Sequence, residues 1–209
     1  MTGTPLSADA LTAYLSRLWS TPVMVEGLAR IPGGASRETY RFDAHADGET
    51  HRLILRRDPG GSLIDTESET EFRAYQSAAG VVPVPRAVAL ERDGAELERP
   101  FFIMERIEGG EVASPFTRAP FGEHGERLGA AFFTALGRLA ALDPAGTPLA
   151  AYLETPAPNR AWQVALDYWE AVLDEDEAQP MPVVRAAIRL LRREPPPQNA
   201  SASSITTIF

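Results

Sequence analysis

The sequence lacks cysteine entirely and has three histidines among 209 residues. The absence of cysteine excludes disulfides, thiolate metal sites and a cysteine nucleophile. No apolar run approaches the roughly 18 to 20 residues that a membrane-spanning helix needs. The segment 1–9 also lacks the basic stretch followed by an apolar stretch that marks a secretory signal. These absences favour a soluble cytoplasmic protein with no membrane partner.

Positive charge is scarce as well. The chain has 20 basic and 29 acidic side chains, which gives a formal net charge of −9. This balance argues against binding to nucleic acid or to anionic lipid, because both kinds of partner select a basic surface. A hydrophobic share of 44% is enough to build a core and argues against wholesale disorder. The length allows one or two domains.

The first half of the chain alternates short extended patterns with turn signals. A leucine stripe predicts a helix over residues 11–19, capped by Ser7 or Asp9. A second helix is expected to be capped by Thr66 or Ser68, to carry acidic residues in its first turns and to stop at Gly80. Strands are predicted at 23–31, 37–44, 52–57, 87–90 and 101–107. The pair Asp47-Gly48 predicts a hairpin turn between the second and third of them.

Helical periodicity dominates after the Gly109-Gly110 pair. Helices are predicted at 127–142, 161–173 and 182–193. A β-rich half followed by an α-rich half predicts an α+β fold of two lobes. We expect an N-lobe at 1–107, a partial helical C-lobe at 108–197, and a disordered tail at 198–209.

Four local features that could carry chemistry follow one another. They are a glycine turn at Gly33-Gly34, Arg56 at the end of an apolar strand, Glu71 on the next helix, and a strand that runs into a glycine-containing connector at 101–110. Glycines let backbone amides approach a phosphate closely, and a strand cation with a helix carboxylate can form an ion pair. Each feature alone also has an ordinary interpretation as a turn, a solvated strand end, a surface residue or a linker.

The order of these features resembles a protein-kinase-like N-lobe and, more closely, the aminoglycoside phosphotransferase family, which includes choline kinase-like proteins. The resemblance implies a five-stranded antiparallel sheet with one helix, followed by a truncated helical C-lobe. It also implies phosphoryl transfer from ATP to a small hydroxyl compound, whose identity the sequence does not give. The resembling segments are 31–44, 53–61, 69–90, 99–112, 136–144 and 187–197.

The same resemblance assigns cofactor-binding roles. Arg56 matches the strand cation, which many relatives supply as lysine, and Glu71 matches its helix partner. Glu105 and Ile107 would offer backbone groups to adenine, with Met104 behind the ring. The loop over the phosphates would comprise Gly33, Gly34, Ser36 and Thr39.

The catalytic residues of the family have no match. Relatives place a His-x-Asp loop, a nearby asparagine and a magnesium-binding aspartate after the proline run that ends the third C-lobe helix. His45, His51 and His124 are not followed by x-Asp. The sequence therefore gives no catalytic residue and no metal ligand, although the family implies magnesium. We expect a truncated and catalytically inactive chain.

The tail at 198–209 suggests one origin for this departure. Codons compatible with it, read one base out of register, can encode a Leu-Val-His-x-Asp-Tyr segment like that of the family's catalytic loop. A frameshift is therefore one hypothesis, and an unrelated tail is the other. Two alternatives to an inactive kinase remain open: a non-catalytic module that binds nucleotide or a partner, and an enzyme completed by a second chain. Self-association would use helical faces around Trp162, Trp169 and Leu190.

Overall fold

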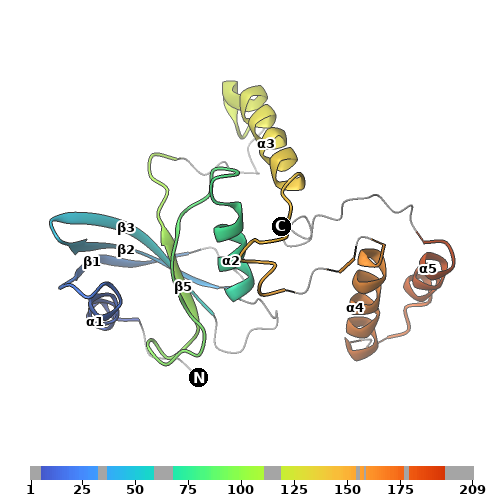
Figure 1. Cartoon of the computed structure of the whole chain (residues 1–209), viewed down its shortest axis with the longest axis horizontal. Coiled ribbons are helices and arrows are strands. Elements are labelled where there is room, and N and C mark those ends of the chain that lie inside the picture. The colour runs from blue at the N-terminus through green and yellow to red at the C-terminus, as the bar shows by residue number, and fades with distance from the viewer. Residues whose placement is uncertain are drawn as a thin grey trace.

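A computed structural model of the chain describes residues 6–32, 37–58, 68–110, 119–153, 156–157, 159–176 and 179–195. Within these ranges the first half forms one antiparallel sheet with a helix on each face, and the second half is helical (Figure 1). The sheet has five strands in the order β1-β2-β3-β5-β4. Their bounds are β1 Met24–Ile31, β2 Glu38–Ala46, β3 Glu49–Arg57, β4 Ala87–Glu91 and β5 Phe101–Glu105. The predicted α+β fold is confirmed.

The hairpin between β2 and β3 sets the register of the sheet centre. Asp47 and Gly48 both have positive φ values, 51° and 81°, as the tight turn of a twisted hairpin requires. The turn pairs Ala46 with Glu49, so β3 begins three residues before the predicted 52–57. On the other side of β3, the strand β5 ends at Glu105 instead of residue 107. The chain leaves the sheet there because the pairing of β5 with β3 and β4 is complete.

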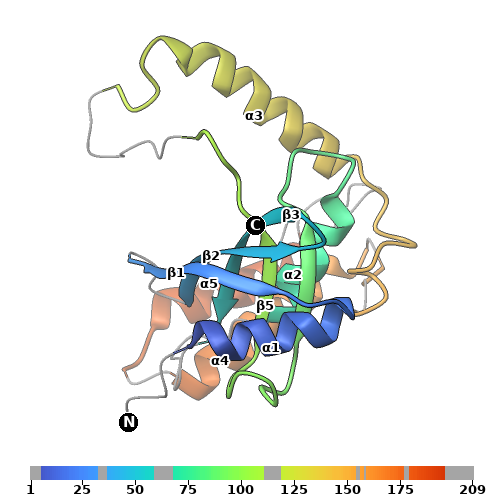
Figure 2. The same cartoon turned by 90° about the vertical axis from the view of Figure 1, so that its left-hand side faces the viewer.

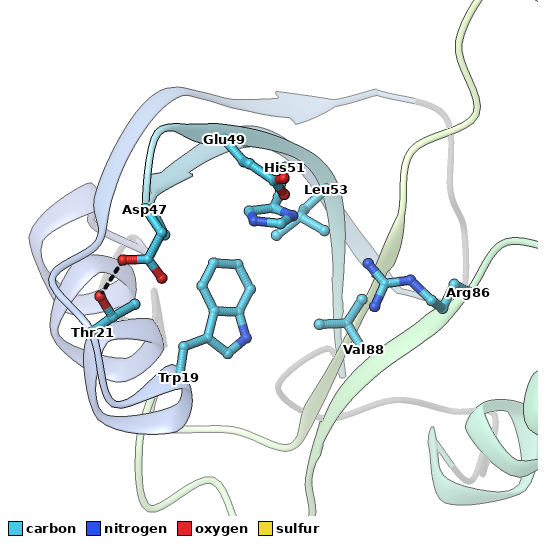
Figure 3. Close-up of a pocket in the computed structure, with 9 residues that line it drawn as sticks. Trp19, Thr21, Asp47, Glu49, His51, Leu53, Arg86 and Val88 are labelled. Atoms are coloured by element: carbon cyan, nitrogen blue, oxygen red, sulfur yellow. Dashed lines mark hydrogen bonds between the residues drawn. The ribbon is translucent and has the colours of Figure 1, made fainter.

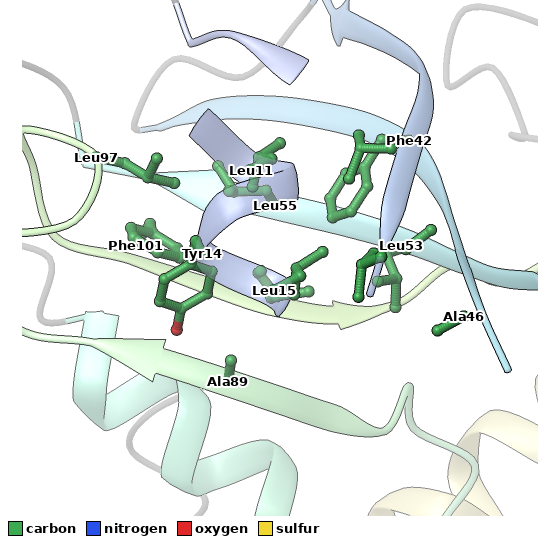
Figure 4. Close-up of a cluster of buried hydrophobic side chains, with 14 residues drawn as sticks. Leu11, Tyr14, Leu15, Phe42, Ala46, Leu53, Leu55, Ala89, Leu97 and Phe101 are labelled. Carbon is green, nitrogen blue, oxygen red and sulfur yellow. The ribbon is translucent and has the colours of Figure 1, made fainter. Parts of the chain in front are cut away.

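The helix α1, Ala8–Trp19, covers one face of the sheet. The Ser7 side chain caps it by accepting a 3.1 Å hydrogen bond from the Ala10 amide. Leu11 and Leu15 are fully buried in the main core, and Tyr14 meets Phe101 edge-on with ring centroids 5.2 Å apart (Figure 4). Leu11 and Leu15 of the predicted stripe thus pack on the sheet, whereas Leu18, also in that stripe, is exposed.

The opposite face carries α2, Ser68–Ala78 (Figure 2). Successive strand residues point to opposite faces, so Phe102 lies on the far side of β5 from Phe101. Phe72 of α2 packs against Phe102 with ring centroids 6.2 Å apart. The sheet is therefore sandwiched between two helices, of which α2 is the one that follows β3 in the chain.

The second half contains the three predicted helices, α3 Gly125–Ala140, α4 Ala161–Asp176 and α5 Pro182–Arg193, preceded by the short turn η1 Gly122–His124. A small cluster joins the halves: Leu149 packs on Ala74 of α2, and the Leu149 amide donates a 3.0 Å hydrogen bond to the Ser77 hydroxyl. Among the described residues no helix is long and apolar enough to cross a lipid bilayer.

Candidate functional site

The predicted strand cation and helix carboxylate are in direct contact. Arg56, next to the end of β3, donates from Nη1 to Oε1 of Glu71 on α2. Arg56 lies opposite Thr39 on β2 and opposite Phe102 on β5, so all three side chains share the face that α2 covers. The antiparallel register and the helix after β3 therefore bring together three residues that the sequence places in separate segments.

A second guanidinium, which the sequence analysis missed, uses the same carboxylate. Arg37 donates from Nη1 to Oε2 of Glu71 and from Nε to Asp58 Oδ1 at 2.9 Å. The same Asp58 oxygen accepts a 2.5 Å hydrogen bond from the Ser68 hydroxyl at the start of α2. The side chain of Arg37 is 3% exposed, whereas that of Arg56 is 24% exposed. Arg56 is therefore the guanidinium that solvent or a ligand can reach.

An aromatic ring supports both guanidinium groups. The Cζ atoms of Arg37 and Arg56 lie 5.7 and 5.6 Å from the centre of the Phe102 ring, within the range of cation–π attraction. The hydroxyl of Tyr75 on α2 adjoins the same group, and its pKa is raised by burial and by the negative charge of Glu71. The site pairs two guanidinium groups with the carboxylates of Glu71 and Asp58, and the Phe102 ring supports both cations.

Ion pairs anchor the connector that follows β5. Arg106 lies 2.9 Å from Asp43 and donates a 2.7 Å hydrogen bond to Glu108. Burial opposes the charge on Arg106, but the hydrogen bond and negative charges of these carboxylates outweigh it and raise the pKa of the guanidinium. The Glu105 amide donates to the Arg86 carbonyl at 2.9 Å, and Ile107 is 73% exposed.

A separate charged cluster lies at the same end of the sheet but on the other face. Glu38 accepts hydrogen bonds from Arg57 at 2.7 Å and from Arg99 at 3.0 Å, and Arg57 is 2% exposed. Burial raises the cost of the Glu38 charge, but Arg57 and Arg99 more than compensate, and the pKa of Glu38 is lowered. This cluster ties β2, β3 and the start of β5 together and is structural in character.

The structure places the predicted site residues in two groups. Thr39, Arg56 and Glu71 come together beside α2, while Met104, Glu105 and Ile107 lie at the end of β5 and in the connector after it. Gly33, Gly34 and Ser36 lie outside the described residues. The residues that the sequence analysis missed around Glu71 are Arg37, Asp58, Ser68, Tyr75 and Phe102.

One signal in the sequence could have pointed to Arg37. It directly follows the glycine-containing turn, so it enters the sheet beside the loop predicted to cover phosphates. All 20 basic side chains of the protein are arginine, and the strand cation, Arg56, is one of them. One glutamate serves two cations because its carboxylate has two acceptor oxygens, and each guanidinium takes one of them. Within the described ranges no group of three or more acidic or histidine side chains forms a metal site.

Comparison with known proteins agrees with this geometry. Residues 27–205 match the model of the phosphotransferase enzyme family, APH. A crystal structure of a candidate aminoglycoside phosphotransferase from Ralstonia eutropha JMP134 superposes with a TM-score of 0.64 at 22% identity, covering 94% of this chain and 56% of that one. The GDP complex of wild-type aminoglycoside 2′-phosphotransferase-IIIa superposes with a TM-score of 0.54 at 14% identity, covering 90% and 58% respectively.

Acyl-CoA dehydrogenase family member 10 of Mus musculus is also similar, with 34% identity over 105 residues. That match covers 48% of this chain and 9% of the mouse protein. The chain therefore spans less than two thirds of the length of each of these relatives. The fold is the kinase-like fold of the aminoglycoside phosphotransferases. The family match covers most of the sequence, and the chain belongs to the phosphotransferase enzyme family.

Proposed function

We propose that this chain forms the nucleotide-binding side of an ATP-dependent small-molecule kinase, in which 1–107 holds the nucleotide and 108–197 begins the acceptor lobe. The observation that carries the proposal is the contact between Arg56 on β3 and Glu71 on α2. A partly exposed guanidinium held by a helix carboxylate is the arrangement that positions a cation for phosphate in kinase-like folds. That a structural neighbour was solved as a GDP complex supports a nucleotide as the ligand class.

The phosphates would lie beside Arg56 on the face of the sheet that α2 covers. Arg56 would donate to phosphate oxygens with the part of its fork that Glu71 leaves free. Thr39 lies directly opposite Arg56 on β2, where its hydroxyl could add a donor. Backbone amides of Gly33, Gly34 and Ser36 would complete the phosphate loop.

The adenine would lie along the connector after β5. The Glu105 amide is already bonded to Arg86, so Glu105 would contribute its carbonyl. The Ile107 amide would supply a complementary donor. Met104 pairs with Ile54, two residues before Arg56, so Met104 and Arg56 lie on the same face of the sheet. Met104 would lie behind the base.

Transfer needs groups that are not among the residues of this sequence. The family's His-x-Asp base and metal-binding aspartate have no counterpart among these residues. Loss of a general base alone costs roughly 10²- to 10⁴-fold in rate. We therefore infer that this polypeptide alone binds nucleotide without turnover, and that a hydroxyl acceptor is phosphorylated only when those groups are supplied.

A calorimetric titration tests the nucleotide site. Wild-type chain is titrated with ATP and GTP, each with and without magnesium, beside Arg56→Ala and the matched control Arg17→Ala. Arg17 is 59% exposed on α1, on the opposite face of the sheet, so its removal should leave affinity unchanged. We expect saturable binding that weakens about tenfold or more in Arg56→Ala. Equal affinity of the two variants would reject this placement of the phosphates.

One observation favours a second function, partner binding. The helices α3 to α5 carry large apolar side chains on the surface within the described residues. Exposed apolar patches of this kind mark interfaces. Sedimentation of wild-type chain and Phe132→Ser at several concentrations tests self-association, which should weaken in the variant. The exposed side chains are Leu128, Phe132, Phe133, Leu136, Val164, Tyr168, Trp169, Val183, Val184, Leu190 and Leu191.

A further inference from the structure

Arg37 connects three separate segments around the proposed phosphate site. It directly follows the glycine-containing turn and directly precedes β2. Its side chain reaches Asp58, the residue after β3, and Glu71 on α2. That side chain is 3% exposed, whereas the side chain of Arg56 is 24% exposed. Because so little of Arg37 is accessible, it acts on a ligand through its neighbours and not by direct contact.

The contacts of Arg37 fix the position of the Glu71 carboxylate. Nε donates to Oδ1 of Asp58 at 2.9 Å, and Nη1 donates to Oε2 of Glu71. The same Asp58 oxygen accepts the Ser68 hydroxyl at the start of α2, and the Phe102 ring lies 5.7 Å from Cζ of Arg37. A guanidinium group is planar and rigid, so bonds on two of its sides fix its orientation. This orientation determines where Oε2 of Glu71 lies.

The bond to Arg37 limits what Glu71 can offer to Arg56. With Oε2 occupied, Glu71 binds Arg56 through Oε1. A carboxylate whose two oxygens are both free commonly binds one guanidinium through two parallel hydrogen bonds. Such a pair would use two of the five N–H donors of Arg56, where the observed contact uses one. Arg37 therefore leaves Arg56 with more donors for a ligand.

We propose that Arg37 is a positioning residue of the phosphate site, because it holds one oxygen of Glu71 and so keeps Arg56 singly bound and open to a phosphate group. The shared carboxylate also compensates only part of the charge on Arg56, which strengthens the attraction of Arg56 for an anion beside it. This role rests on the proposed nucleotide function, since it serves the same site.

Chemical modification tests the restraint on Glu71 in the absence of nucleotide. Phenylglyoxal attacks accessible guanidinium groups, and mass spectrometry of the digested full chain gives the rate at each arginine. In Arg37→Gln, Glu71 should bind Arg56 with both oxygens. Arg56 should then react about threefold to tenfold more slowly than in the wild-type chain, which is the effect of one further hydrogen bond. An unchanged or faster rate at Arg56 would overturn the proposal.

The same spectra report whether the variant folds. Arg57 is 2% exposed in the cluster on the other face of the sheet, so it should react only if the sheet opens. If Arg57 becomes reactive in Arg37→Gln, the comparison is repeated with Arg37→Met, an apolar side chain of similar length that suits the buried position against Phe102. Reactivity of Arg57 in both variants would mean that the sheet itself requires Arg37, and the positioning role would be rejected.

Arg73 supplies the matched control on the same helix. Its side chain is 24% exposed, as that of Arg56 is, but it binds a different carboxylate, Glu69, at 2.7 Å. Arg73→Gln should therefore leave the modification rate of Arg56 unchanged. A slower rate at Arg56 in this control would show that the loss of any arginine near α2 has the same effect, which would overturn the specific role of Arg37.

A double-mutant cycle then tests the effect on nucleotide binding. ATP affinity is measured by calorimetry for the wild-type chain, Arg37→Gln, Arg56→Ala and the double variant. Arg37→Gln alone should weaken ATP binding about threefold to tenfold, but it should add little to the loss that Arg56→Ala already causes. Equal losses in both backgrounds would indicate a general structural effect and would overturn the proposal.

The two experiments separate failure of this proposal from failure of the nucleotide function. If the wild-type chain binds no ATP, the nucleotide function is rejected and the phosphate role of Arg37 with it. The modification rates still decide whether Arg37 restrains Glu71, because they are measured without nucleotide. If ATP binds but the rate at Arg56 does not fall in Arg37→Gln, only the role of Arg37 is rejected.

Discussion

Glu71 holds Arg56 with one carboxylate oxygen while its other oxygen holds Arg37. The carboxylate of α2 therefore binds arginines at the end of β3 and just before the start of β2. Two guanidinium groups packed on Phe102 depend on one carboxylate for their compensating charge, together with Asp58. Because one carboxylate binds both guanidinium groups, the site also contributes to the stability of the sheet.

Replacement of Glu71 by glutamine tests that dependence. The change keeps the size of the side chain but removes the charge that compensates the buried Arg37. We expect the free energy of unfolding to fall by about 1–3 kcal/mol, since buried charged groups lose their partners. Urea denaturation measures the change, and Glu123→Gln should be neutral as an exposed control. A neutral Glu71→Gln would show that Asp58 alone suffices for Arg37.

The lowered pKa of Glu38 predicts that the protein loses stability in acid. Its folded-state pKa lies below its ordinary value because Arg57 and Arg99 outweigh the effect of burial. A carboxyl group with a lowered pKa contributes stability above its unfolded-state pKa, about 4.3, and this contribution is lost as the pH falls through the folded-state value. Wild-type chain and Glu38→Gln should therefore differ at neutral pH and converge in acid. Parallel stability curves down to the most acid pH would contradict this prediction.

Substitution of two leucines of α1 tests which face of this helix packs on the sheet. Leu11 is 0% exposed, whereas Leu18 is 45% exposed. Leu11→Ala should lower the free energy of unfolding by about 2–5 kcal/mol, because it removes buried methyl groups and leaves a cavity. Leu18→Ala should change it by less than about 1 kcal/mol, as at other exposed positions. Similar losses in both variants would mean that α1 packs on the sheet through a different face.

Gly94 occupies a position that no other residue fits. Its φ is +72°, and a Cβ atom there would lie 2.7 Å from backbone atoms of Arg99. Gly48 has a similar φ of +81° but open space around it. Gly48→Ala would therefore place alanine in an unfavourable left-handed backbone conformation without a steric clash. Gly94→Ala should destabilise the chain more than Gly48→Ala in thermal unfolding. The segment before β5 would have to move, and the bond from Arg99 to Glu38 would weaken.

Much of the architecture was readable in the sequence. The leucine stripe predicted α1, the Asp47-Gly48 pair predicted the hairpin, and α5 was predicted with the bounds that the structure has. These features depend on local periodicity and on backbone conformations that few residues accept, so neighbouring residues determine them. Strand ends were less accurate: β3 starts earlier and β5 stops earlier than predicted, because strand length depends on partners elsewhere in the chain.

The candidate site divides in the same way. The order of the sequence features, and the family that this order resembles, pointed to Arg56 and Glu71 as a pair, because a strand cation and a carboxylate on the next helix can form an ion pair. The tertiary structure added Arg37, Asp58 and Phe102 to that pair, and of these only Arg37 has a signal in the sequence, its place directly after the glycine-containing turn. Their proximity follows from the register of β2, β3 and β5, and register is a property of paired strands that no single segment contains.

A pocket on the face of the sheet that α1 covers depends wholly on the tertiary structure (Figure 3). Trp19, Asp47 and Arg86 come from a helix end, a hairpin and the start of a strand, and the sequence connects none of them. Composition and periodicity determined which residues are buried and which segments are helix or strand. The geometry of the sheet, in which β5 ends before β3 does, decided which charged side chains face one cavity. Side chains from distant segments meet only after the strands have paired.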